Sequence, residues 1–425
     1  MPDLLSESAT RSTLAARFQA TRARTERLCA PLEVEDYQLQ SMPDCSPPKW
    51  HLAHTAWFFE TFVLARHELS FQPFHPQFCY LFNSYYNAVG SRWPRPARGL
   101  LSRPTVQEVY KYRQVTDERI LELIESVDDP TLAELAPVVE IGLNHEEQHQ
   151  ELLLTDLKHA FGLNPLRPRY ASSDAQPQRA EALPLEWESC PSGVRSVGYG
   201  EGELGFAFDN EGPRHRVFLA PFAFASRPVT NGEYLDFIAD NGYDRPELWL
   251  SDGWAARQAC GWAAPLYWQR EGTGYSQFTL RGMRPLNLAE PACHISYYEA
   301  DAYARWAGAR LPTEFEWETA VGPRQVRGNF LDSERFHPCV NATEDTDYGN
   351  VWVWTASPYL AYPGYQPAFG ALGEYNGKFM CNQIVLRGGS CATPAGHVRP
   401  TYRNFFPPDA RWQFSGLRLA KDVTS

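Results

Sequence analysis

The spacing of apolar and polar positions divides the chain into a helical first part and a mixed second part. Residues 8–32, 46–67, 105–127 and 129–162 repeat apolar side chains at intervals of three and four, as amphipathic helices do. One long connection, about residues 68–104, separates the second and third of these segments. Four such helices with one long connection predict a four-helix bundle.

Local signals place the ends of these helices. Ser46 and Thr105 stand where N-caps are expected, and prolines follow Ser46 in the first turn. Pro137 predicts either two helices or one kinked helix in the last segment. Gly162 is a suitable stop.

The pattern changes after residue 165. Residues 166–185 are rich in Pro, Ala and Arg without periodicity, which predicts a linker. Beyond it, "PVTNGEYLDFI" and "SYYEADAYARWAGARLPTEFEWETAV" favour helices, whereas "HRVFLAPFAFA", "VLRGGS" and "SGLRLA" favour strands. We therefore expect two domains, a helical one over 1–165 and an α+β one over 186–425.

Composition narrows the class of protein. The net charge of −12 argues against a nucleic acid or an anionic membrane as partner. Nine cysteines, an odd number without a C-x-x-C pair, indicate reduced thiols rather than a disulfide framework. The N-terminus lacks a signal-peptide core, and no apolar run approaches the length of a membrane span. We expect a soluble cytoplasmic protein; its oligomeric state stays open.

The string "NHEEQHQ" contains His145, Glu146 and His149, an H-E-x-x-H sequence typical of zinc metalloproteases. On a helix, residues four apart lie about 40° apart around the axis. The same stripe carries Val138 and Leu152, so both imidazoles are expected to point into the bundle core. Two histidines on one buried stripe favour metal ligation over a structural role.

The residues that follow His149 argue against a metalloprotease. Leu152 and Thr155 stand where the extended protease motif has Gly and His. Glu146 is expected to be a solvated surface residue. Glu151 is expected to point away from both histidines, where it braces the helix.

A catalytic metal typically takes three protein ligands. The third candidate lies upstream in "KWHLAHTAWFFE", where His51 and His54 both qualify. A bundle brings either one opposite His145 and His149. Three neutral imidazoles with open positions suit Fe(II), Zn(II) or another divalent ion.

Three stretches, "SPPKWHLAHTAWFFE", "NSYYNAVGSRWPRPARGLLSRPT" and "NHEEQHQE", resemble the iron-dependent sulfoxide synthases of ergothioneine biosynthesis. In that family a DinB-like four-helix bundle carries an H-x-x-x-H-x-E motif, matched here by His145, His149 and Glu151. A third histidine comes from a W-x-L-A-H segment. The resemblance therefore implies that His54, rather than His51, completes the metal set.

The second part resembles the formylglycine-generating-enzyme (sulfatase-modifying) domain, a variant of the C-type lectin fold. The matching strings are "PVTNGEYLDFI", "YARWAGARLPTEFEWETAV", "GNVWVWTASPY", "LRGGS" and "SGLRLA". Val353 stands where that family usually has Glu. Cys381 and Cys391 do not match the spacing of its copper-binding cysteines, which argues against oxidation of a protein cysteine by this domain alone.

The resemblance implies an enzyme that uses O2 and Fe(II) to join a thiol to C2 of hercynine, the Nα-trimethyl derivative of histidine, as a sulfoxide. The thiol is cysteine or γ-glutamylcysteine. Arg95 and Arg98 are expected to bind its carboxylate, since arginine holds carboxylates in a two-pronged fork. Tyr85 or Tyr86 is expected to donate a proton or hydrogen bond during catalysis.

Hercynine brings a quaternary ammonium group, which aromatic faces bind. Asn404, Phe405 and Phe406 match the hercynine-binding region of the family. Gln148, between the two histidines, is a further candidate for contact with hercynine.

Three rival functions remain. The first is the ovothiol branch, which joins cysteine to C5 of histidine; its enzymes commonly carry a methyltransferase domain, and no G-x-G-rich strand-turn-helix pattern is visible here. The second is a zinc-dependent thiol transferase of the DinB type. The third is a non-catalytic lectin-like binding module.

Overall fold

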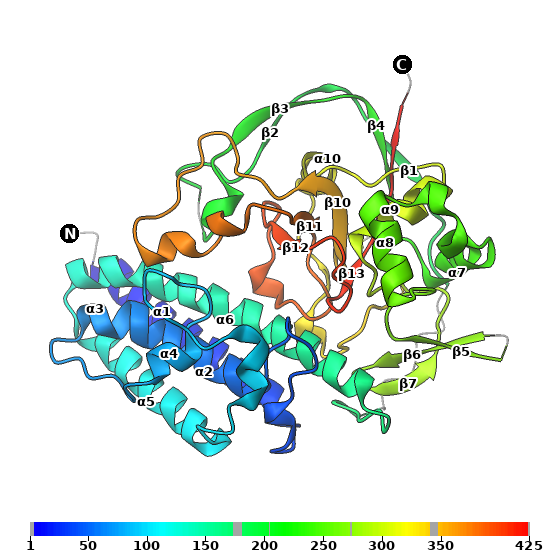
Figure 1. Ribbon diagram of the computed structural model, residues 1–425. Coiled ribbons are helices and arrows are strands. Elements are labelled where there is room, and N and C mark those ends of the chain that lie inside the picture. The colour runs from blue at the N-terminus through cyan, green and yellow to red at the C-terminus, as the bar shows by residue number, and fades with distance from the viewer. Residues whose placement is uncertain (1–3, 173–180, 204, 273, 341–346, 424–425) are drawn as a thin grey trace. The chain divides into compact units, whose positions relative to one another are not determined.

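The computed structural model describes residues 4–172, 181–203, 205–272, 274–340 and 347–423. The chain forms two compact units (Figure 1). The first comprises Met1–Asn164 with the short segment Phe369–Glu374, and the second comprises Pro165–Ala368 with Tyr375–Ser425. The middle of the expected linker lies outside the described residues.

The first unit is a four-helix bundle, as the sequence predicted. Its long helices are α1 (Leu4–Cys29), α2 (Pro48–Phe59), α5 (Val106–Ser126) and α6 (Asp129–Leu163). Helix α1 packs on α5 and α6, and α2 packs on α5 and α6, so the helices lie side by side (Figure 1). Shorter elements are η1 (Asp36–Gln38), the π-helix η2 (Glu60–Leu64), α3 (Ala65–His67), α4 (Phe78–Phe82) and η3 (Arg95–Leu100).

The helix ends agree with the sequence signals in part. Thr105 caps α5 through a capping box with Glu108, as expected. The N-cap of α2 is Pro47 rather than Ser46. The backbone N–H of Ser46 instead donates to Oδ2 of Asp156. Helix α6 runs unbroken through Pro137 and ends one residue past Gly162. Of the two alternatives that Pro137 left open, the structure therefore shows one helix rather than two, because packing along the bundle outweighs the local cost of proline.

The second unit is α+β, as predicted. Its helices are α7 (Asn231–Ala239), α8 (Ser251–Cys260), α9 (Tyr297–Trp306) and α10 (Glu314–Val321). Capping boxes begin three of them, because each has Ser or Thr at the N-cap and Glu three residues later. Among its 3-10 helices, η4 (Asp209–Glu211) carries Asn210, which contacts Arg403 and Tyr359.

The described residues of this unit also form five small sheets. The largest has the order β12-β11-β10-β13, and a three-stranded sheet has the order β1-β4-β14. Strands β5, β6 and β7 form a meander, and β2 pairs with β3 as β8 does with β9. The strands are β1 (Trp187–Cys190), β2 (Gly193–Val197), β3 (His215–Leu219), β4 (Phe222–Ala225), β5 (Trp268–Glu271), β6 (Gly274–Thr279), β7 (Gly282–Pro285), β8 (Gly328–Asn329), β9 (Tyr348–Gly349), β10 (Trp352–Pro358), β11 (Ile384–Arg387), β12 (Asn404–Phe406), β13 (Ser415–Gly416) and β14 (Ala420–Asp422).

The core of the second unit explains one departure of the sequence from the sulfatase-modifying pattern. Val353 is buried in an apolar cluster with Phe224, Trp317 and Tyr348. A glutamate at this position would place a charge among apolar side chains, which is costly without a partner. Valine therefore fits this core better. In the described part of the chain, no helix combines the length and apolarity needed to cross a membrane.

Candidate metal centre

Helix α2 brings polar side chains into the interior of the bundle. All twelve of its residues are buried, including His51, His54 and Thr55. Buried polar groups require partners. The Nδ1 atom of His54 lies 2.6 Å from the Phe82 carbonyl oxygen, to which it donates a hydrogen bond. This contact leaves the Nε2 atom of His54 with its lone pair, the form that binds metals.

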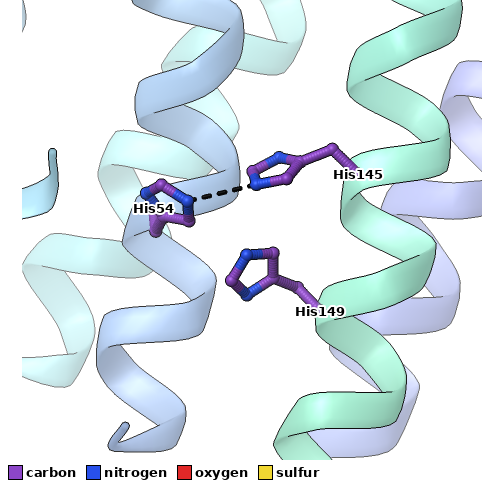
Figure 2. A group of neighbouring side chains, drawn as sticks. All are labelled: His54, His145 and His149. Carbon is purple, nitrogen blue, oxygen red and sulfur yellow. Dashed lines mark hydrogen bonds between the residues drawn. The ribbon is translucent and has the colours of Figure 1, made fainter. Parts of the chain in front are cut away.

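The three histidines His54, His145 and His149 converge from α2 and α6 (Figure 2). One nitrogen from each ring lies within 4.8 Å of the other two. The Nε2 atoms of His54 and His145 are 3.1 Å apart. His54 and His145 are buried, and His149 is half-buried.

The surroundings keep these imidazoles neutral. Burial lowers the pKa of His145 to about 3. Burial and then the neighbouring imidazole of His145 hold the pKa of His54 and of His149 well below the ordinary value. Three neutral nitrogen donors directed at one point fit a divalent transition metal. The residues present therefore suit the metal that the sequence predicted.

Two tryptophans fix the ring of His54. Trp50 stacks on it with 4.4 Å between ring centroids, and Trp57 does so at 5.3 Å, each at 15°. The ring centroids of Phe58 and His145 are 4.8 Å apart. A ring held between flat partners has little rotational freedom, so the nitrogen is oriented before a metal arrives. The sequence carried a signal for this, because Trp50 stands one helical turn before His54.

Glu146 is buried, so the prediction of a solvated surface residue was wrong. Its side chain is 0% exposed and accepts hydrogen bonds from Arg22, Arg113 and Thr25 at 2.6, 2.9 and 2.6 Å. Burial alone would raise the pKa of Glu146, but the two guanidinium charges outweigh burial and hold it at about 2. Sequence reasoning missed this cluster because Arg22 and Arg113 stand far from residue 146 in the chain.

His51 lies beside the three-histidine cluster rather than in it. Its Nδ1 atom lies 2.8 Å from Nδ1 of His149, and its Nε2 atom lies 3.2 Å from Oδ2 of Asp156. Both ring nitrogens are therefore engaged. The group of described side chains that could hold a metal ion contains His54 from α2, and His51 is not a member of it.

Arg98 lies near this cluster and is buried. Its guanidinium carbon is 3.4 Å from the centroid of the Trp50 ring, and its nitrogens donate to the hydroxyls of Ser46 and Ser84 at 2.8 and 3.2 Å. The carboxylate of Asp156 is close enough to attract its charge. Burial lowers its pKa well below the ordinary arginine value. Arg95, by contrast, is exposed and donates to the carbonyl of Asp44.

Tyr85 and Tyr86 stack on each other, with 4.6 Å between centroids. Tyr86 is buried against Trp57 and Phe62, and Tyr85 is half-buried. Because Trp57 in turn stacks on His54, both tyrosines belong to the aromatic surroundings of the cluster. The backbone that follows them is held by Glu374, which accepts from the N–H groups of residues 87 and 88.

The remaining candidates are on α6 and in the second unit. Gln148 is half-buried on α6. Asn404, Phe405 and Phe406 form β12 and are all half-buried. Tyr359 covers one face of the Phe405 ring at 4.0 Å and 10°. The contact of these four residues with hercynine stays a prediction.

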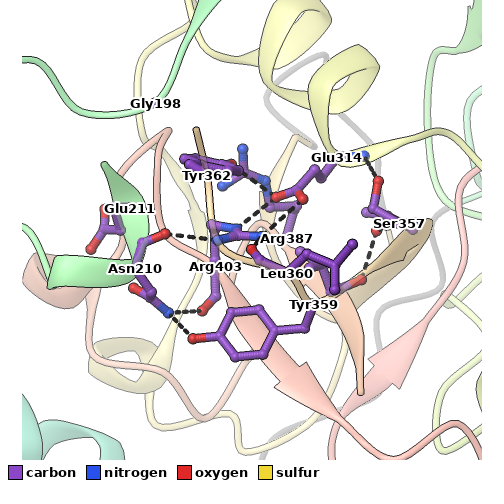
Figure 3. Close-up of polar contacts among 12 residues, drawn as sticks. Gly198, Asn210, Glu211, Glu314, Ser357, Tyr359, Leu360, Tyr362, Arg387 and Arg403 are labelled. Carbon is purple, nitrogen blue, oxygen red and sulfur yellow. Dashed lines mark hydrogen bonds and ion pairs between the residues drawn. The ribbon is translucent and has the colours of Figure 1, made fainter. Parts of the chain in front are cut away.

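A buried polar network anchors the start of β12 (Figure 3). Arg403 donates twice to Glu314, at 2.8 and 3.0 Å, and once to the carbonyl of Asn210. The Asn210 amide donates in turn to the hydroxyl of Tyr359. This network fixes the backbone next to Asn404. Sequence reasoning missed it, since its members come from four separate segments.

The fold and the cluster define a helical bundle with three converging histidines that could hold a metal ion, in one chain with a sulfatase-modifying-type unit. Residues 17–153 match the DinB superfamily, and residues 180–346 and 345–423 match the sulfatase-modifying factor enzyme 1-like domain. The hercynine oxygenase of Mycolicibacterium smegmatis is 32% identical over 97% of this chain and 99% of its own length. That of Mycobacterium tuberculosis is 32% identical over 96% and 99%. A formylglycine-generating enzyme of Thermomonospora curvata is 30% identical over 55% and 92%. The chain belongs to the hercynine oxygenase family.

Proposed function

We propose that this protein is a non-haem iron(II) enzyme that uses O2 to join a cysteine-type thiol to C2 of hercynine, forming the sulfoxide of ergothioneine biosynthesis. The observation that carries the proposal is the cluster of His54, His145 and His149 in a chain that aligns with hercynine oxygenases over nearly its whole length. The proposed thiol is cysteine or γ-glutamylcysteine.

Iron(II) is the proposed cofactor, held by the Nε2 atoms of His54 and His149 together with His145. When bound, iron supplies redox chemistry with O2 and a Lewis acid for a thiolate, whereas zinc has no redox chemistry. The low pKa values of the three imidazoles keep their lone pairs available at neutral pH.

Arg98 is the proposed partner of the thiol's carboxylate. Its guanidinium is buried against Trp50, and its hydrogen bonds go to the hydroxyls of Ser46 and Ser84. A buried cation of this kind gains most from an anionic ligand, because burial has already removed its water. Arg95 is the proposed second member of the pair, and its side chain is exposed.

Tyr85 or Tyr86 is proposed to donate a proton from its Oη atom during the reaction. Asn404, Phe405, Phe406 and Gln148 are proposed to bind hercynine. Aromatic faces suit its quaternary ammonium group, and the amides suit its carboxylate and imidazole.

Metal exchange tests the proposal. Protein purified without oxygen is loaded with Fe(II) or with Zn(II), then given hercynine, each thiol in turn, and O2. We expect O2 uptake and a product of sulfoxide mass with Fe(II) and one of the thiols, and neither with Zn(II). The variant His54→Ala should lose both signals, and His75→Ala, at an exposed histidine of the same unit, should keep them. Equal turnover with Zn(II) would indicate a zinc-dependent thiol transferase, and no product with either thiol would refute the proposal.

A further inference from the structure

A chain of three side chains leads away from the histidine cluster. Oδ2 of Asp156 lies 3.2 Å from Nε2 of His51, whose Nδ1 lies 2.8 Å from Nδ1 of His149. The backbone N–H of Ser46 also donates to Oδ2 of Asp156, at 2.8 Å. His51 and Asp156 are 2% and 5% exposed. His149 and Asp156 stand seven residues apart on α6, about two turns, so both face α2, which carries His51.

The direction of each hydrogen bond follows from what the groups can donate. A carboxylate only accepts, so the Nε2–H group of His51 donates to Asp156. When the His51 ring carries a single proton, on Nε2, its Nδ1 atom is an acceptor. The Nδ1–H group of His149 must then be the donor between the two rings. His149 consequently presents the lone pair of its Nε2 atom.

We propose that His51 and Asp156 are positioning residues that hold His149 in the tautomer required of a metal ligand. This inference rests on the metal site of the proposed function, and not on its substrates. Metal-bound histidines generally donate their second ring N–H to a carboxylate, a carbonyl or water. Here His54 donates to the Phe82 carbonyl, whereas His149 reaches a carboxylate through an intervening imidazole.

The hydrogen-bonded chain Asp156–His51–His149, which we call the relay, has two consequences for the metal site. The negative charge of Asp156 attracts the N–H protons of both rings and so raises the electron density on Nε2 of His149. This nitrogen therefore binds a metal more strongly. In addition, both nitrogens of His51 are occupied, which keeps this histidine from competing as a ligand.

Substitutions at His51 separate this role from simple packing. In His51→Asn, the Oδ1 atom stands near the position of Nδ1 and still accepts from His149. In His51→Leu, the volume remains but the acceptor is lost. The relay predicts Co(II) affinity about 10- to 100-fold weaker in His51→Leu, with much of it recovered in His51→Asn. A packing role predicts the reverse order.

The matched control is His67→Gln. His67 is another half-buried histidine of the helical unit, at the end of α3 and outside the cluster. Its substitution should change Co(II) affinity less than twofold. Affinity is measured by competition with a chelator, without substrates, so failure of the proposed reaction would leave this result intact.

The wild-type protein supplies a test that needs no variant. In Zn(II)-loaded protein with ¹⁵N-labelled histidine, long-range ¹H–¹⁵N correlation spectra report which ring nitrogen carries the proton. The expected result is Nε2–H for His51 and Nδ1–H for His149. A proton on Nδ1 of His51, or His51→Leu binding Co(II) as tightly as wild type, would overturn the inference.

Discussion

At the scale of single residues, the glutamate of the H-E-x-x-H sequence has a structural task. In a metalloprotease this glutamate acts as general base. Here Glu146 is enclosed by Arg22, Arg113 and Thr25, and its pKa of about 2 makes it a weak base. The cluster instead ties α6 to α1 and α5 one residue from His145.

The variant Glu146→Gln tests this structural role. Removing one partner from a buried ion pair leaves the other charge uncompensated, which costs about 3–5 kcal/mol of unfolding free energy. The control is Glu140→Gln, because Glu140 pairs with Arg17 at the surface of the same helices; its cost should stay below about 1 kcal/mol. Urea denaturation followed by the helical circular dichroism signal measures both. Equal effects of the two variants would contradict the buried role.

The variant Arg98→Lys tests the proposed carboxylate contact. Lysine lacks the planar fork and stacks poorly on Trp50. We expect the KM for the thiol to rise roughly 10- to 100-fold, as loss of hydrogen bonds to a charged group does, with little change in the KM for hercynine. Arg92→Lys is the control, at an exposed arginine of the same connection. Equal increases for both substrates would show that Arg98 acts on the fold instead.

At the scale of elements, the close approach of α2 and α6 sets the distance between ligands. A Cβ atom on Gly142 would lie 2.5 Å from a ring carbon of Phe59 and 3.0 Å from one of Phe58. Phe58 in turn contacts the ring of His145. Only glycine at residue 142 therefore allows α2 and α6 to lie this close together, one turn before His145.

The variant Gly142→Ala should both destabilise the bundle and weaken metal binding. Overpacking costs about 1–3 kcal/mol, which exceeds the gain in helix propensity of up to about 1 kcal/mol. Phe59→Leu removes the ring that the new Cβ would contact. In a protein that carries Phe59→Leu, Gly142→Ala should therefore lower the free energy of unfolding by a smaller amount. Thermal unfolding and Co(II) titration of the four proteins measure this coupling. Additive effects would show that the helices do not meet at this point.

The elements also show what sequence patterning reveals and what it leaves out. Helical periodicity predicted the bundle and the histidine pair, because both depend on local spacing. It left His51 and His54 as equal candidates, since helices that pack at an unknown rotation present either one. It misjudged Glu146, because a charged residue is buried only when distant arginines meet it, and these belong to other helices.

At the scale of the whole molecule, all three proposed ligands belong to the helical unit. Binding of a metal stabilises the state that binds it by mass action. Hydrogen–deuterium exchange with Co(II) should therefore show slower exchange in α2 and α6 than in the metal-free protein. The hairpin of β2 and β3 should exchange at an unchanged rate, and His54→Ala should abolish the difference. Slower exchange spread evenly over both units would contradict this localisation.

The central claim is that a thiol is joined to C2 of hercynine at this iron site. The most direct measurement uses hercynine carrying deuterium at C2 or at C5, with the Fe(II)-loaded protein, O2 and each thiol. Product mass spectra should show that deuterium is lost from C2 and retained at C5. Loss from C5 with retention at C2 would contradict the account and indicate the ovothiol type of bond formation.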